Sequence, residues 1–158
     1  MKYWITVVSK DHITRGVAGG FMQANHGKQG PLTHMATGDW VIIYSPKKSM
    51  DGDEKLQAFT AIGRVAGDEI YQYKMSEDFK PFRRDVTYYE CKETPIVPLV
   101  DKLSFMPNKQ SWGYPFRFGF FELPGHDFEL IKNHMLSNEP TPINKTLHYG
   151  KANVKNRN

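Results

Sequence analysis

Short alternating apolar segments, joined by irregular connections rich in glycine and proline, constrain the fold of this chain more than any other feature. Such segments, with many β-branched and aromatic residues, are typical of strands. No regular helices of about 10–15 residues separate them, so a doubly wound parallel sheet is disfavoured. The pattern predicts a mixed α+β fold, α/β in the broad sense, with a curled mixed sheet or small barrel. The predicted strands cover residues 3–8, 40–44, 56–65, 71–73, 83–91 and 116–123.

Two short helices are predicted beside these strands. The first is a turn over residues 12–17, with Ser9 or Asp11 as its cap. The second extends from a cap at Asp127 to about Leu136. Its apolar residues recur at helical spacing, so one face is expected to be buried.

Individual strand residues carry further predictions. Ser45 followed by Pro46 is expected to end the second strand, because proline cannot donate a ladder hydrogen bond. Gly63 indicates a bulge or a close approach of two backbones. Arg117 is expected on the last strand, on the face opposite Phe116.

The length of 158 residues fits one domain with a short tail. The single cysteine, Cys91, excludes an internal disulfide and a cysteine-based zinc site within one chain. No apolar run approaches the roughly 20 residues that cross a bilayer, and the N-terminus lacks the apolar core of a signal peptide. We therefore expect a cytoplasmic protein with no membrane partner.

The net charge of +4 is unevenly distributed. Residues 141–158 hold four basic groups and no acid, so residues 1–140 are neutral overall. Within that body, residues 1–48 are net basic and residues 49–79 are net acidic. Such segregation is consistent with a polarised surface that steers a polyanion, and equally with ordinary solvated charge.

Common catalytic and cofactor motifs are absent from the sequence. The glycine-rich run at 16–21 lacks the dinucleotide fingerprint and the Walker lysine. There is no HExxH pair and no GxSxG elbow. We predict no catalytic residue, no cofactor and no metal, with a metal site of His12, His26 and His34 as an open alternative.

Polar, basic and aromatic residues gather at the ends of the predicted strands. Aromatic rings can sandwich a nucleobase, small polar side chains can read its edge, and basic side chains can hold flanking phosphates. The competing interpretation is that Phe21 and Trp112 simply fill the core. The group comprises Ser9, Lys10, Asp11, His12, Phe21, Gln23, Asn25, His26, Gly27, Lys28, Tyr44, Ser45, Pro46, Lys47, Ser111, Trp112, Gly113, Tyr114 and Arg117.

Several stretches, in their order and spacing, resemble the EVE domain of the PUA-like superfamily. The resemblance covers roughly residues 2–136, and it predicts a domain at 1–137 followed by a basic, flexible tail at 138–158. The stretches are YWITVVSKDHITRGV (3–17), GGFMQANHGKQGPL (19–32), GDWVIIYSPK (38–47), LQAFTAIGRV (56–65), FRRDVTYYE (82–90) and SWGYPFRFGFFELPGHDF (111–128).

The resemblance implies a PUA-like curled β-barrel of five to six strands with two to four flanking short helices. EVE domains are similar to YTH domains, which hold a methylated RNA base in an aromatic cage. One cage wall is implied around Phe21 and a second at Tyr71 or Tyr73. Combined with the strand-end pattern, the predicted base pocket is Ser9, Asp11, His12, Phe21, Met22, Gln23, His26, Tyr44, Ser45 and Trp112, and the predicted phosphate contacts are Lys10, Lys28, Lys47 and Arg117.

The leading hypothesis is a non-catalytic module that binds DNA or RNA and takes a modified base, methylated cytosine or adenine, into an aromatic pocket. The main alternative is a small amidohydrolase acting on a modified nucleoside, as in the related PUA-like ASCH domains, with Lys28, Thr60 and Glu90 as candidates. A third possibility is a module for a protein or small molecule. Salt-dependent binding separates the first hypothesis from the third, because phosphate contacts release counterions.

Overall fold

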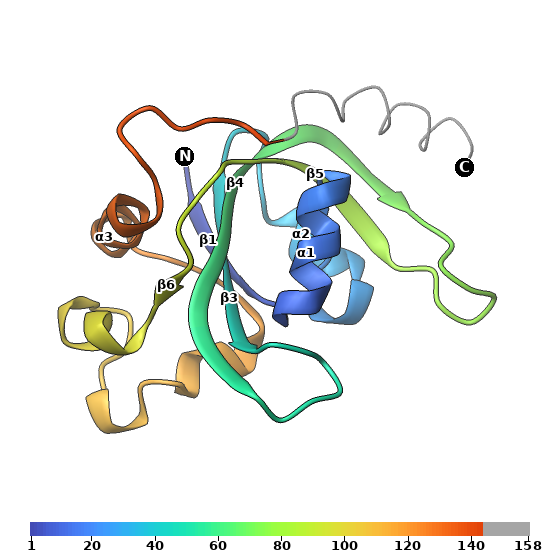
Figure 1. Cartoon of the computed structure of the whole chain (residues 1–158). Helices are drawn as coiled ribbons and strands as arrows, with labels where there is room; N and C mark the ends of the chain where they lie inside the picture. The colour runs from blue at the N-terminus through green and yellow to red at the C-terminus, as the bar shows by residue number, and fades with distance from the viewer. Residues whose placement is uncertain (144–158) are drawn as a thin grey trace.

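A seven-stranded sheet organises the chain in the computed structural model, which describes residues 1–143 (Figure 1). The strands follow the order β2-β5-β4-β3-β1-β7, and β6 pairs with β4. Only the β1–β3 pair, among the strands described, is parallel. The strands are β1 (Tyr3–Val7), β2 (Phe21–Met22), β3 (Trp40–Lys47), β4 (Lys55–Gln72), β5 (Phe82–Tyr88), β6 (Thr94–Pro95) and β7 (Phe120–Glu122).

The mixed α+β class is confirmed, but the expected closure into a barrel is wrong. The order starts at β2 and ends at β7, and within residues 1–143 these two edge strands do not pair with each other. They contain only two and three residues. Such short edges offer too few backbone groups for the continuous ladder that a closed barrel needs.

Short helices cover both faces of the sheet. In Figure 1, α1 and α2 lie on one side of the strands and α3 lies on the other. The helices are α1 (Lys10–Gly19), α2 (Gln29–Thr33) and α3 (Gly125–Met135), with 3₁₀ turns η1 (Asn25–Gly27), η2 (Val97–Lys102), η3 (Lys109–Ser111) and η4 (Tyr114–Phe118).

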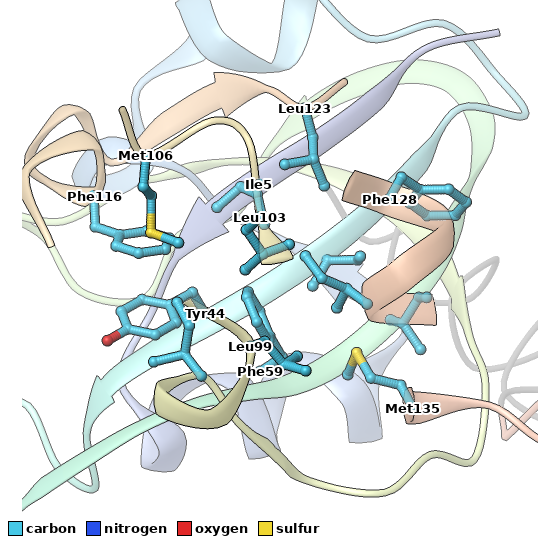
Figure 2. Packing of buried hydrophobic residues seen from close by; sticks show 14 of the residues in the cluster. Ile5, Tyr44, Phe59, Leu99, Leu103, Met106, Phe116, Leu123, Phe128 and Met135 are labelled. Carbon is cyan, nitrogen blue, oxygen red and sulfur yellow. The ribbon is translucent and has the colours of Figure 1, made fainter. Parts of the chain in front are cut away.

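Two apolar cores result from this arrangement. Successive residues of a strand point to opposite faces, so Ile42 and Tyr44 enter one core while Val41 and Ile43 enter the other. The first core packs against α3 and the 3₁₀ turns (Figure 2), and the second packs against α1 and α2. A central strand buried on both faces explains the unbroken apolar run at 40–44.

Three predicted strand ends are wrong, and one is that of the 83–91 segment, because β5 stops at Tyr88. Strand β3 continues through Pro46, which lies at a register irregularity between Ser45 and Lys47, where a missing N–H is tolerated. Strand β4 continues from the predicted 56–65 segment to Gln72 and includes most of the predicted strand at 71–73. Its pairing with β5 shifts register between Val65 and Ile70, so the ladder resumes after an interruption.

The close approach expected at Gly63 is confirmed. A Cβ atom there would lie 2.6 Å from the carbonyl oxygen of Thr87 and 2.6 Å from Cγ1 of Val86. Both neighbours belong to β5, so the missing side chain lets β4 and β5 pair at this point.

The segment predicted as a strand at 116–123 has a different conformation. It forms η4, a left-handed turn at Gly119 with φ 75°, and then the three-residue strand β7. Pro115 favours a helical start and glycine a left-handed end, and together they override the alternation. Arg117 is therefore an exposed residue of a 3₁₀ turn, and the strand-face argument for it is wrong.

Asp127 does not cap α3, because Pro124 occupies the N-cap position. The Asp127 carboxylate is fully buried and accepts hydrogen bonds from Ser104 N (2.9 Å), Ser104 Oγ (2.8 Å) and Phe105 N (2.9 Å). It anchors the loop after η2 to the helix. Ser9 does occupy the N-cap position of α1, but its hydroxyl bonds no helix N–H.

The start of the predicted tail lies along the sheet. Glu90 N donates to Thr141 O at 2.9 Å, and Ile143 N donates to Tyr88 O at 2.8 Å. The basic part of the predicted tail, from Lys145 on, lies outside the described residues. Within residues 1–143, no helix has the length and apolar character needed to cross a membrane.

Candidate functional site

A cavity of about 710 Å³ opens where the ends of β1 and β3 meet α1, η4 and the β4–β5 connection. This volume lies in the range of small-ligand pockets. Its lining residues are Val7, Val8, Ser9, His12, Ile13, Arg15, Gly16, Phe21, Met22, Gln23, Ala24, Asn25, His26, Gly27, Ile43, Pro46, Lys47, Met50, Tyr73, Met75, Phe79, Arg83, Phe116, Arg117 and Gly119.

The charged lining of the cavity is entirely basic. Arg15, Lys47, Arg83 and Arg117 contribute permanent cations, and no aspartate or glutamate of residues 1–143 is among the lining residues. Converging cations around a low-dielectric hollow focus a positive potential. The arrangement therefore favours an anionic or acceptor-rich ligand.

Arg83 on β5 lies between two aromatic rings. Its guanidinium carbon is 3.8 Å from the ring centroid of Phe21 and 4.0 Å from that of Tyr73. Its Nε donates a 2.8 Å hydrogen bond to Oε1 of Gln23, just beyond β2. Burial lowers the pKa of Arg83 from its ordinary value, but an arginine stays charged at neutral pH.

The neighbouring arginine has a structural role. Arg84 points to the other face of β5 and donates hydrogen bonds to the carbonyl oxygens of Leu32, Met35 and Gly67. These bonds attach α2 and the chain after it to the sheet. Successive side chains of a strand point to opposite faces of the sheet. Arg83 therefore lines the cavity, while Arg84 makes structural hydrogen bonds on the other face.

A left-handed turn forms part of the cavity wall. Asn25, His26 and Gly27 have φ values of 46°, 62° and 82°. Two successive non-glycine residues in this region store strain, which clusters at binding sites in proteins. The turn places the exposed His26 and the half-buried Asn25 at the cavity.

Eight of the predicted site residues do line the cavity. They come from the end of β1, from α1, from β2 and the chain after it, from β3 and from η4, so the fold brings together segments more than 100 residues apart. These residues are Ser9, His12, Phe21, Met22, Gln23, His26, Lys47 and Arg117.

Three predicted pocket residues belong to the interior instead. Tyr44 is 2% exposed and stacks on Phe116 with ring centroids 3.9 Å apart (Figure 2), and burial raises its pKa to about 12. Ser45 is fully buried, and its hydroxyl donates to Val8 O at 2.6 Å. Trp112 packs against the first core, as the competing interpretation expected.

Three more predicted residues lie outside the lining. Asp11 accepts a 2.6 Å hydrogen bond from the Ser9 hydroxyl, and this bond is the main reason that the pKa of Asp11 is lowered. Lys10 forms a 2.9 Å ion pair with Glu93. Lys28 is exposed at the N-terminus of α2.

The two tyrosines implied as a second cage wall separate in the structure. Tyr71 donates a 2.7 Å hydrogen bond to Asp85 and does not line the cavity. Tyr73 lines it, but the face of its ring contacts Arg83. The guanidinium of Arg83 therefore fills the space between Phe21 and Tyr73, where the implied cage would hold a base.

Sequence reasoning missed several lining residues. Asn25 belonged to the group at the strand ends but not to the predicted pocket, and its place before a histidine and a glycine is a weak signal for a left-handed turn, since asparagine and glycine tolerate that conformation. Arg83 gave no signal, because its ring partners Phe21 and Tyr73 belong to two other segments, and Phe21 is far away in sequence. The others that were not predicted are Val7, Val8, Ile13, Arg15, Gly16, Ala24, Ile43, Met50, Met75, Phe79, Phe116 and Gly119.

Comparison with protein families finds a match to the model of the EVE domain over residues 2–134. A UPF0310 protein of Mycolicibacterium vanbaalenii is 53% identical over 137 residues, which cover 87% of this chain and 94% of the relative. The UPF0310 protein YdcG of Bacillus subtilis is 43% identical over 133 residues, covering 84% and 91%.

Solved structures share the fold at low sequence identity. Protein Atu2648 from Agrobacterium tumefaciens has a TM-score of 0.53 at 14% identity, covering 90% of this chain and 99% of that chain. A hypothetical protein from Leishmania major also has a TM-score of 0.53, at 12% identity, covering 84% and 93%.

Proposed function

Because this chain belongs to the EVE domain family, we propose that it is a non-catalytic nucleic-acid-binding module that takes a single modified base, such as a methylated base, into the cavity described above. Membership in this PUA-like family supports the general nucleic-acid-binding role. The base enters after leaving its stack, and the flanking phosphates stay at the mouth.

The charge and shape of the cavity carry this proposal. Its volume of about 710 Å³ accommodates a base with its sugar, and its charged lining residues are Arg15, Lys47, Arg83 and Arg117. Arg15 and Arg117 are exposed and suit phosphates, which a polyanion presents on both sides of an extruded nucleotide.

Aromatic and thioether side chains at the rim supply contacts for bases. Phe79, Met75 and Met50 line the cavity and expose 41%, 51% and 43% of their surface. A base stacked on an aromatic ring gains about 1–3 kcal/mol. Burial of one methyl group adds about 0.8 kcal/mol, so discrimination of a methylated base requires a close-fitting wall as well.

The placement of the hydrolase candidates supports a non-catalytic role. Thr60 is buried, and its hydroxyl lies 2.7 Å from that of Ser45. Lys28 and Glu90 are exposed. None of these three side chains lines the cavity.

A fluorescence titration tests the proposal. Oligonucleotides with and without one methylated base are compared at fixed salt, in both DNA and RNA form. Binding that weakens with salt and favours one modified oligonucleotide supports the proposal. Equal weak binding to every oligonucleotide rejects base reading, and salt-insensitive or absent binding rejects the nucleic-acid role. Release of the acyl group from acylated cytidine would support the hydrolase instead.

A further inference from the structure

Arg83 is a buried cation whose two Nη groups lack a hydrogen-bonding partner within residues 1–143. Only 7% of the residue is exposed, and its Nε is bonded to Gln23. Among residues 1–143, neither Nη group has a hydrogen-bond partner or a carboxylate within 4.0 Å. No fully buried side-chain nitrogen among the described residues lacks a hydrogen-bond partner, so the two unpartnered Nη atoms are accessible. Arg83 lines the cavity, and we infer that its Nη atoms face it.

The surrounding groups hold this guanidinium in a defined orientation. Phe21 and Tyr73 contact its faces at 3.8 and 4.0 Å, and Gln23 holds its Nε edge. The remaining edge presents two parallel N–H donors to the cavity. A planar fork that is held in place loses little freedom on binding and matches a flat group with two acceptors side by side.

Few bases offer such a pair of acceptors. Cytosine has O2 beside N3 on its Watson–Crick edge, which is exposed once the base is extruded, and guanine has O6 beside N7. Adenine and uracil or thymine alternate donors and acceptors along their edges. The Arg83 guanidinium can only donate hydrogen bonds. Opposite adenine or uracil, one of its N–H groups would face an N–H group of the base, so both donors would remain unpaired.

We propose that Arg83 determines base specificity, selecting a base with two adjacent acceptors, cytosine or guanine, over adenine and uracil. This inference rests on the proposed nucleic-acid-binding function of the cavity. Arg83 lies inside the cavity between rings, whereas Arg15 and Arg117 are exposed, so the interior cation contacts the base and the exposed ones contact phosphates.

The experiment uses single strands of seven nucleotides in which every position but the central one is abasic. The central base is cytosine, guanine, adenine or uracil, so all four strands carry the same charge. Binding is measured by fluorescence polarisation at fixed salt. Further strands with 3-deazacytosine or 7-deazaguanine remove one acceptor and identify which pair is used.

Three variants of the full chain complete the experiment. Arg83→Lys keeps the charge and loses the fork, and Arg83→Met removes the charge and keeps an apolar chain between the rings. Arg64→Lys is the matched control, because Arg64 bonds the carbonyl oxygen of Gly38 and does not line the cavity. Thermal melting verifies that each variant is folded.

We expect the unaltered protein to bind the cytosine or guanine strand at least about tenfold tighter than the adenine and uracil strands, the scale of one bidentate pair. Arg83→Lys should abolish this preference, and Arg64→Lys should keep it. Equal salt-dependent binding of all four strands overturns the inference and leaves the proposed function intact. A base preference that survives Arg83→Lys also overturns the inference. So does an equal loss of affinity for all four strands, because that result indicates a phosphate contact. No binding to any of these unmodified strands also overturns the inference, whereas the proposed function fails only if the modified oligonucleotides of the titration above are not bound either.

Discussion

The Oδ1 atom of Asn25 lies so close to Gly119 that a Cβ atom at position 119 would collide with it. Only glycine at position 119 leaves room for it, and the φ of 75° at Gly119 also favours glycine. Asn25 and Gly119 are 94 residues apart in sequence, yet the side chain of Asn25 packs directly against the backbone of Gly119. Both residues line the cavity.

Gly119→Ala is therefore expected to destabilise the protein by about 1–3 kcal/mol, through backbone strain and displacement of Asn25. Urea denaturation measures the change. Gly113→Ala is the control, because Gly113 has a φ of −74° and nothing within 4 Å of an added Cβ. If both substitutions have the same small effect, the contact between Asn25 and Gly119 does not matter for stability.

His26→Gly is expected to raise the free energy of unfolding by up to about 1 kcal/mol, because glycine relieves the left-handed strain at φ 62°. The same variant should bind oligonucleotides more weakly, since the imidazole at the cavity is lost. Thermal melting and fluorescence titration measure the two effects. His34→Gly, at a φ of −76°, lacks the strain and should only destabilise. A less stable His26→Gly would contradict the strain argument.

Asp39 links the start of β1 to the start of β3 and makes stability depend on pH. Burial opposes its ionisation, but hydrogen bonds from Ala36 N, Trp4 Nε1 and Lys2 N outweigh burial, so its pKa lies below 3.8. Because the folded-state pKa is lowered, its contribution to stability is present above about pH 3.8 and is lost as the pH falls through the lower, folded-state pKa.

Asp39→Asn should cost about 1–3 kcal/mol at pH 7, because the buried carboxylate accepts charge-assisted hydrogen bonds from the buried Trp4 and from two backbone N–H groups, and a neutral amide weakens or loses them. The difference from the unaltered protein should narrow as the pH falls below about 3.8, because the unfolded carboxyl then takes up a proton that the folded carboxyl, with its lowered pKa, still resists. Urea denaturation at pH 7 and at two acidic pH values measures this. The exposed Asp101→Asn variant is the control. A pH-independent difference would contradict the linkage.

Lys47→Ala and Arg117→Ala should each lower the slope of log affinity against log salt by about 0.7, the value for one phosphate contact on a single strand. Both side chains line the cavity. Lys102→Ala, an exposed lysine of η2 outside the lining, should leave the slope unchanged. An unchanged slope in the two cavity variants would place the phosphates elsewhere.

Much of the sheet could be predicted because strand alternation is a local property. The segments at 3–8, 40–44 and 83–91 correspond to β1, β3 and β5. The prediction that Pro46 ends its strand was wrong, because the effect of a missing N–H depends on whether the partner strand needs that hydrogen bond. The two-residue strands β2 and β6 are too short to give a period, so they and the open edges of the sheet escaped prediction.

The chain sequence alone defined the alternating strands, the basic and aromatic residues at their ends and the resemblance to EVE domains. Only the tertiary structure decided that Tyr44 and Ser45 turn inward, and that Arg83 lies between Phe21 and Tyr73. The reason is physical: alternation assigns a residue to one of two faces, but which face is core and which is cavity depends on the helices that cover them. A guanidinium between two rings likewise depends on contacts between separate segments, here with Phe21, which is distant in sequence, and with Tyr73, and no local pattern records them.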